Sequence, residues 1–282
     1  MTLYLNLRQG ALGYGLREVP DPLEGDGLVA RPTLKRLEHR DFAARLDNRS
    51  VVFAVHGFNV SYDRGLRSVA RLEAALKPLL PADFVVVGVL WPGDFLIPAI
   101  NYPGEWRDAV EGGRHLALYA DTWLRGARDL HFLSHSLGGR LALEATARLG
   151  RKAGQVCLTA PATDDDCLES PYDASVRNAR GLTYLASKRD MVLKAAYRIG
   201  DWAGDLFFGD DDAATRGALG WHGARWPRTD QPGVQGEQIA KADNYGHGSY
   251  FPPGKPGEAI SLQQSRVATY VAQFLRGGPA RW

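Results

Sequence analysis

The stretch LHFLSHSLGG, residues 130–139, decides the interpretation of this chain. Its first four residues form an apolar run of strand length, and residues 139–149 have the composition of a helix. Between them, Ser136 lies at the centre of a pentapeptide that differs from Gly-x-Ser-x-Gly only by Ser134 at its first position. A serine at the apex of such a strand-to-helix turn is exposed above a sheet, and N–H groups of the helix can face an oxyanion. The stretch therefore predicts a nucleophile elbow.

Length and composition favour one large core. The chain has 282 residues, is 45% hydrophobic and shows no internal repeat, so we expect a single domain over residues 1–282. The net charge is +2 without a run of basic residues, which argues against a nucleic-acid partner. The longest apolar runs, such as residues 84–91, are far too short for a membrane span. We expect a small-molecule substrate, and the oligomeric state stays open.

The cysteines and the first residues indicate a cytoplasmic protein. Residues 1–8 alternate apolar and polar side chains and lack the basic and apolar segments of a secretion signal. Cys157 and Cys167 are too few for a disulfide framework, and free thiols are typical of a reducing compartment.

The order of apolar patterns predicts an α/β fold. Five nearly continuous apolar runs are typical of strands buried on both faces of a parallel sheet: 51–55, 84–90, 130–133, 155–159 and 182–186. Helical periodicity is visible over residues 62–80, 107–124 and 263–275. Alternating strands and helices predict a mostly parallel, doubly wound sheet.

Two regions depart from this alternation. Residues 3–8 and 27–34 resemble strands, with turn residues over 20–25 between them, so residues 1–49 are predicted to add antiparallel edge strands. Residues 201–250 are rich in Gly, Trp and Asp with little periodicity, which predicts a cap, long loops or a small lid at the mouth of a site.

Residues suited to activate the serine follow in a suitable order. A serine hydroxyl needs a histidine to accept its proton, and a carboxylate to orient that histidine. Asp190 comes just after the strand at 182–186, and His247 comes shortly before the last helix. The sequence therefore predicts Ser136 as nucleophile, Asp190 as acid and His247 as base.

Other residues remain as alternatives. His222 is the other histidine after the acid, and Asp164 or Asp166 could supply the carboxylate one strand earlier. His135 is expected to be structural because neighbouring residues of a strand point to opposite faces. His56 is expected to pack beneath the loop that follows the first parallel strand.

That loop is predicted to complete an oxyanion hole. Strand residues 51–55 are followed by His-Gly-Phe-Asn, and Gly57 permits a turn. The N–H of Phe58 is the first choice as donor, paired with the N–H of Leu137 after the nucleophile. Asn59 is the substitute if the loop runs one residue longer.

These segments resemble one family. The residues that carry the resemblance are His56–Asn59, Trp91–Gly93, His135–Gly138, and Ala160–Pro161 followed by Asp164–Asp166. Together they resemble a largely uncharacterised bacterial α/β-hydrolase family with H-G-[FY]-N, W-P-[SG] and H-S-[LM]-G motifs, over roughly residues 50–250. The resemblance implies an α/β-hydrolase fold and serine hydrolase chemistry, with Ser136, Asp190 and His247 on the family's nucleophile, acid and base. Gly139 stands where Asn is frequent.

The expected substrate is an apolar or aromatic ester. Apolar and aromatic side chains near the strand ends and the predicted loops are candidate substrate-binding residues: Trp91, Phe95, Tyr102, Met191 and Tyr245. We expect a carboxylesterase that works through an acyl-enzyme, without a cofactor, and no metal-ligand spacing is present. A thioesterase, amidase or acyltransferase with the same triad, and a binding scaffold without turnover, are the alternatives.

Overall fold

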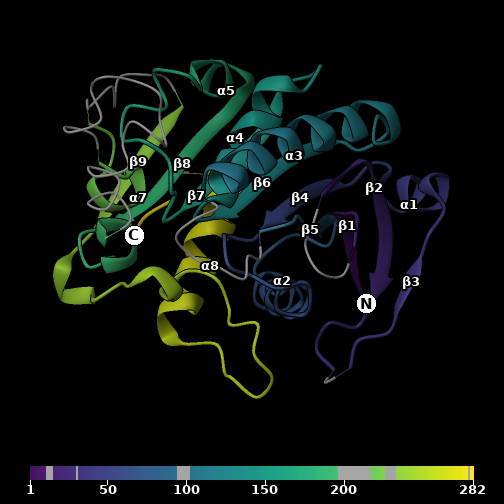
Figure 1. Ribbon diagram of the computed structural model, residues 1–282, viewed down its shortest axis with the longest axis horizontal. Helices are drawn as coiled ribbons and strands as arrows, with labels where there is room; N and C mark the ends of the chain where they lie inside the picture. The colour runs from purple at the N-terminus through teal and green to yellow at the C-terminus, as the bar shows by residue number, and fades with distance from the viewer. Residues whose placement is uncertain (11–14, 30, 94–101, 196–216, 226–232, 279) are drawn as a thin grey trace.

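The computed structural model describes residues 1–10, 15–29, 31–93, 102–195, 217–225, 233–278 and 280–282. Within these ranges, nine strands form one sheet in the order β3-β2-β1-β5-β4-β6-β7-β8-β9 (Figure 1). The strands are β1 Thr2–Arg8, β2 Leu16–Gly25, β3 Leu34–Arg36, β4 Ser50–Val55, β5 Phe84–Leu90, β6 Asp129–His135, β7 Ala153–Thr159, β8 Ala179–Ser187 and β9 Val234–Ile239.

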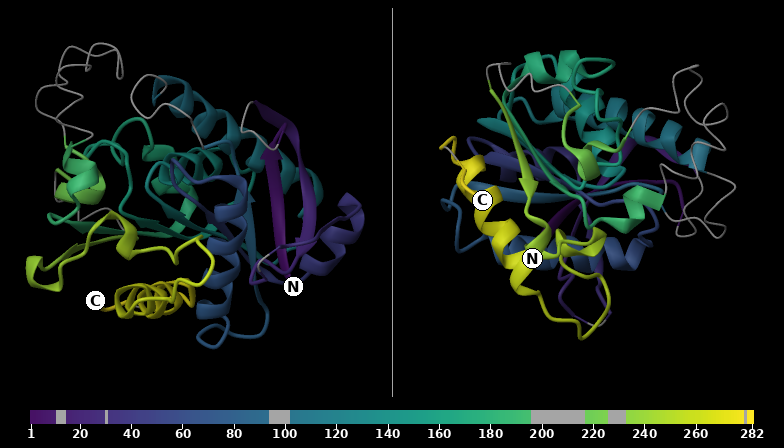
Figure 2. Two further views of the ribbon diagram at one scale, coloured as in Figure 1. Left: turned by 60° about the horizontal axis from the view of Figure 1, so that its bottom comes forward. Right: turned by 90° about the vertical axis from the view of Figure 1, so that its left-hand side faces the viewer.

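Helices cover both faces of this sheet. They are α1 His39–Leu46, α2 Tyr62–Leu76, α3 Tyr102–Trp123, α4 Gly138–Arg148, α5 Asp173–Asn178, α7 Leu219–His222 and α8 Leu262–Leu275, with short 3₁₀ helices η2 Lys241–Asp243 and η3 His247–Ser249. Helices α3 and α4 pack on one face, and α2 and α8 lie on the other (Figures 1 and 2). None of the helices in the described ranges is both long and apolar enough to cross a membrane.

The central strands confirm the predicted α/β architecture. Strands β5, β4, β6, β7 and β8 pair in parallel, and every residue of β4 is buried. Because parallel strands end together, their carboxyl ends meet at one edge of the sheet, where an open α/β sheet commonly holds its site. The segments after β4, β6 and β8 carry the loop residues Gly57–Asn59, Ser136 and Asp190 respectively.

The N-terminal strands are antiparallel, as predicted, but two of their positions were wrong. Strand β2 runs through the predicted turn, including Pro20 and Pro22, and β3 begins only at Leu34. Strand β3 pairs with just three residues of β2, beginning at Leu23. Pro22 is paired with β1 only, and Pro20 lies in the irregular stretch between the paired residues Leu16 and Asp21, so the loss of a ladder N–H is tolerated at both positions.

Strand β9 corrects the prediction of loops over residues 201–250. It pairs in parallel with β8 at the edge of the sheet, and most of its residues are partly exposed. An edge strand with a half-exposed sequence, VQGEQI, has no continuous apolar run for periodicity to detect. The rest of the predicted cap, residues 201–216 and 226–232, lies outside the described residues.

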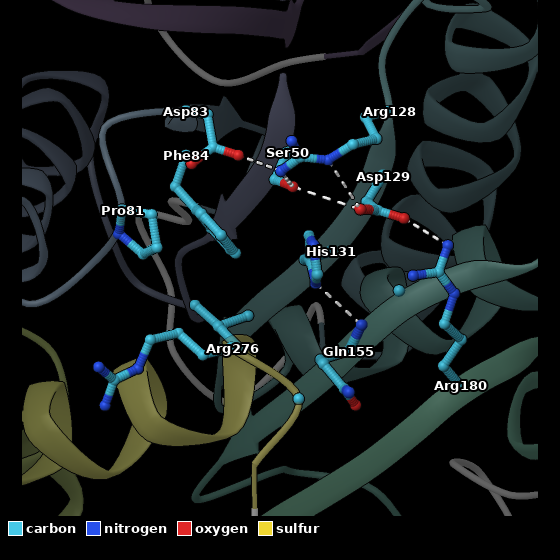
Figure 3. A pocket seen from close by; sticks show the side chains of 13 residues that line it. Ser50, Pro81, Asp83, Phe84, Arg128, Asp129, His131, Gln155, Arg180 and Arg276 are labelled. Atoms are coloured by element: carbon cyan, nitrogen blue, oxygen red, sulfur yellow. Dashed lines mark hydrogen bonds and ion pairs between the residues drawn. The ribbon is translucent and has the colours of Figure 1, made fainter. Parts of the chain in front are cut away.

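The amino ends of the parallel strands surround a cavity of about 350 Å³ (Figure 3). Arg128 forms ion pairs with Asp83 and Asp129, and Arg180 pairs with Asp129 from the other side. His131 lies among them and accepts the N–H of Gln155 at Nδ1 over 2.9 Å. Asp83, Asp129, Arg128 and Arg180 at this edge are thus paired with one another.

Candidate active site

A strained turn presents Ser136. Strand β6 ends at His135, α4 begins at Gly138, and Ser136 between them has φ of 54°. This left-handed conformation costs a residue other than glycine about 1–3 kcal/mol. Three backbone hydrogen bonds hold it: the Ser136 N–H donates to Thr159 O over 3.0 Å, and the Ser136 carbonyl accepts from Gly139 N over 2.9 Å and from Ala162 N over 3.1 Å. The geometry is that of the predicted nucleophile elbow.

Small residues around the turn allow this close approach. A Cβ atom on Gly138 would lie 2.9 Å from the carbonyl oxygen of Val55, and one on Gly57 would lie 2.9 Å from Cβ of Ser136. Ser134, at the first position of the motif, is fully buried, and its carbonyl accepts from the Thr159 hydroxyl over 2.8 Å. The loop after β4 is therefore packed directly against the serine.

The structure brings Ser136, His247 and Asp190 together. His247 Nε2 lies 2.9 Å from Ser136 Oγ, and His247 Nδ1 lies 2.7 Å from Asp190 Oδ2. A carboxylate only accepts hydrogen bonds, so Nδ1 carries the proton and the Nε2 lone pair faces the serine hydroxyl. This tautomer lets His247 accept the serine proton.

Backbone groups hold the carboxylate. The side chain of Asp190 is fully buried, and its Oδ1 accepts the N–H groups of Val192 and Leu193 over 3.1 and 3.0 Å. Asp190 directly precedes a helical segment that begins at residue 191. It therefore caps the first turn of that segment through one oxygen and orients His247 through the other. In the sequence, Asp190 was selected by its position just after the predicted strand at 182–186.

The alternative base, His222, and the acidic triplet Asp164–Asp166 are not part of the hydrogen-bonded chain from Ser136 to Asp190. Asp190 is the carboxylate that bonds His247. The Asp165 N–H donates to Gly217 O over 2.8 Å, and Asp164 forms a backbone bridge with Ala218. His222, on the adjoining helix α7, is exposed and has its ring against Trp221. The acidic triplet thus joins the α7 segment to the end of β7.

Two buried side chains, His56 and Trp91, lie beneath the loop after β4. The indole N–H of Trp91 donates to His56 O over 2.8 Å, and the two rings stack 5.8 Å apart. His56 is buried beneath the loop, as expected, and burial lowers its pKa to about 3, with the charge of Arg8 adding to the effect. The N–H of Asn59 donates to Gly93 O, so the substitute oxyanion donor is already engaged. Phe58 stays the predicted donor beside Leu137, the N-cap residue of α4.

The structure corrects two of the predicted substrate-binding residues. Trp91 has no exposed surface, and Tyr245 is 1% exposed, with its hydroxyl donating to Gln263 O over 3.1 Å. Both belong to the interior beneath the site. Met191 is 60% exposed. Phe95 and the side chain of Tyr102 lie outside the described residues.

Fold and site define a class: an α/β-hydrolase whose elbow serine is hydrogen-bonded to a histidine–aspartate pair. The profile of the family described as "Alpha/beta hydrolase of unknown function (DUF900)" matches residues 35–206, and the chain belongs to that family. The match includes Ser136 and Asp190 and ends before His247. The family assignment therefore agrees with the predicted fold and leaves the substrate open.

Similar solved structures are more distant. They include an esterase of Pyrobaculum calidifontis, 14% identical, with a TM-score of 0.45 over 90% of this chain and 84% of that one. Another is an inhibited esterase B from Lactobacillus rhamnosis, 14% identical, with a TM-score of 0.41 over 82% of this chain and 77% of that one. No curated protein matches the sequence. Similarity at this level carries no argument about activity.

Proposed function

We propose that this protein is a serine hydrolase that cleaves apolar or aromatic carboxylic esters through an acyl-enzyme. The observation that carries the proposal is the continuous chain of hydrogen bonds from Ser136 Oγ through His247 to Asp190, over 2.9 and 2.7 Å. A buried carboxylate, a histidine in the basic tautomer and a serine on an elbow are the parts that nucleophilic acyl transfer requires.

The first half of the reaction follows from these contacts. Ser136 Oγ attacks the ester carbonyl carbon while His247 Nε2 takes the hydroxyl proton. The negative charge of Asp190 stabilises the imidazolium that forms. The oxyanion of the tetrahedral intermediate accepts hydrogen bonds from the N–H groups of Leu137 and Phe58. Collapse breaks the bond to the alcohol oxygen, which leaves with the proton of His247.

The second half repeats these roles with water. His247 Nε2 takes a proton from water as its oxygen attacks the acyl carbon, and then returns that proton to Ser136 Oγ as the acid product leaves. Support for an apolar acyl or alcohol group comes from two exposed apolar side chains directly after the acid, Met191 at 60% and Val192 at 56% exposure.

The test is labelling combined with turnover. Wild type and Ser136→Ala are treated with a fluorophosphonate, and the mass of each intact protein is measured by mass spectrometry. Turnover of p-nitrophenyl esters, a matched thioester and a matched anilide is assayed in parallel. A single adduct that Ser136→Ala lacks, with ester cleaved fastest, supports the proposal. An adduct together with faster turnover of the thioester or the anilide would make the enzyme a thioesterase or an amidase. Folded wild type with neither adduct nor turnover contradicts the proposal and favours a binding scaffold.

A further inference from the structure

The segment that carries the base is held from two sides. His247 begins the single-turn helix η3, between β9 and α8. From α8, the side-chain amide of Gln264 donates to Gly248 O over 3.0 Å and to Phe251 O over 2.8 Å. From the sheet, Nε2 of His135 lies 2.8 Å from the main-chain oxygen of His247 itself. A short helix does not fix its own position, so these contacts set where the base lies.

His135 is a donor without charge. A carbonyl oxygen can only accept, so Nε2 of His135 carries the proton. Burial lowers the pKa of His135 to about 3, and the neighbouring His247 contributes in the same direction. The ring lies 4.7 Å from that of His247 and stacks against Phe251 at 5.5 Å. His135 is therefore a neutral imidazole with one fixed tautomer.

We propose that His135 is a positioning residue for the general base, an inference that rests on the proposed function. His135 immediately precedes Ser136. The end of strand β6 therefore positions the nucleophile directly, and it positions the main chain of His247 through the hydrogen bond from His135 Nε2. The partner of His135 is the carbonyl of His247, and the partner of the Ser136 hydroxyl is Nε2 of that histidine.

The requirement for histidine follows from the charge that develops. His247 becomes an imidazolium during the reaction, and a lysine or arginine at position 135 would place a second positive charge beside it. A phenylalanine would keep a ring against His247 but provide no donor. Neutral imidazole supplies both the packing and the donor, and its low pKa keeps it from competing for the serine proton.

The experiment separates the donor from the packing. His135→Phe keeps an aromatic ring and removes the N–H, whereas His135→Gln keeps an N–H that reaches about as far as Nε2. We expect kcat to fall about 10- to 100-fold in His135→Phe, with KM nearly unchanged, because small displacements of catalytic groups are costly. His135→Gln should recover most of kcat. Equal losses in both folded variants, or none in His135→Phe, would overturn the proposal.

A second readout needs no turnover. The proton between His247 Nδ1 and Asp190 should give a far-downfield NMR resonance in wild type, which we expect to shift or broaden in His135→Phe and to persist in His135→Gln. If wild type is inert to fluorophosphonate but this resonance responds, the proposed function fails, and His135 orients His247 without a catalytic role. If wild type is active and the resonance is unchanged in His135→Phe, the positioning role fails alone. Should His135→Phe not fold, His135→Met replaces it as the variant without a donor.

Discussion

Strand β6 has a histidine near each end, and the two histidines have different hydrogen-bond partners. His131 and His135 are four residues apart on one face of the strand; His131 is buried and His135 is half-buried, and desolvation lowers their pKa values to about 4 and about 3. His131 accepts the N–H of Gln155 on the adjacent strand β7 (Figure 3). His135 donates to the separate segment that carries His247. Burial alone therefore does not distinguish a structural histidine from one at the site, whereas the identity of the partner does.

The carboxylates at the two edges of the sheet also have different partners. At the amino edge, Arg128 and Arg180 neutralise Asp83 and Asp129. At the carboxyl edge, the described partners of the Asp190 carboxylate are His247 and two backbone N–H groups. The negative charge of Asp190 consequently acts on His247, which is the side chain that gains a proton in the proposed reaction.

The largest effect is expected from Asp190→Asn at the carboxyl edge. The asparagine oxygen would keep the N–H groups of Val192 and Leu193, so its NH₂ would face Nδ1 of His247. Nδ1 must then accept, and the proton moves to Nε2, where it blocks the serine hydroxyl. We expect kcat to fall about 10³- to 10⁴-fold with the fold intact, measured by ester turnover and circular dichroism. Near-normal turnover would assign the acid elsewhere.

His131→Phe is the matched control at the amino edge. It removes the acceptor of the Gln155 N–H and leaves that donor unpaired, which should cost about 1–3 kcal/mol of unfolding free energy. The value of kcat should not change, in contrast to His135→Phe. Urea unfolding and ester kinetics on the same preparations measure both quantities. A loss of kcat in His131→Phe without destabilisation would remove the distinction between the two histidines.

The smallest effect concerns pH and Asp83. Its hydrogen bond with Arg128 lowers the pKa of the Asp83 carboxyl below the ordinary value. The stabilisation is therefore complete above that ordinary pKa, and is lost as the pH falls through the lowered native pKa. Arg128→Met should reduce Tm slightly at pH 7 and less in acid, and added salt should narrow the difference at pH 7. A difference that is independent of pH would mean that Arg128 acts by packing.

Local patterns located the core and selected three side chains that the structure brings together. Continuous apolar runs located the parallel strands, because a strand buried on both faces has little room for polar residues. The elbow motif and the order of strand ends selected Ser136, Asp190 and His247, which the structure joins by hydrogen bonds. Strand β9 escaped prediction because an exposed edge imposes little pattern on its residues.

The sequence did not predict which way some side chains point, nor contacts between residues far apart in the chain. An aromatic residue at a strand end can face a substrate or the interior, and Trp91 and Tyr245 face the interior. The contact between His135 and His247 joins residues far apart in the chain, and neither motif spacing nor periodicity reports such a pair.

Adjacency of His135 and Ser136 has a consequence for thermal motion. The nucleophile and the residue that holds the main chain of His247 both lie at the end of β6, so we expect them to move together. Asp190 follows β8, with β7 between that strand and β6. Twisting of the sheet is therefore expected to change the distance between His247 and Asp190 more than the distance between Ser136 Oγ and His247 Nε2.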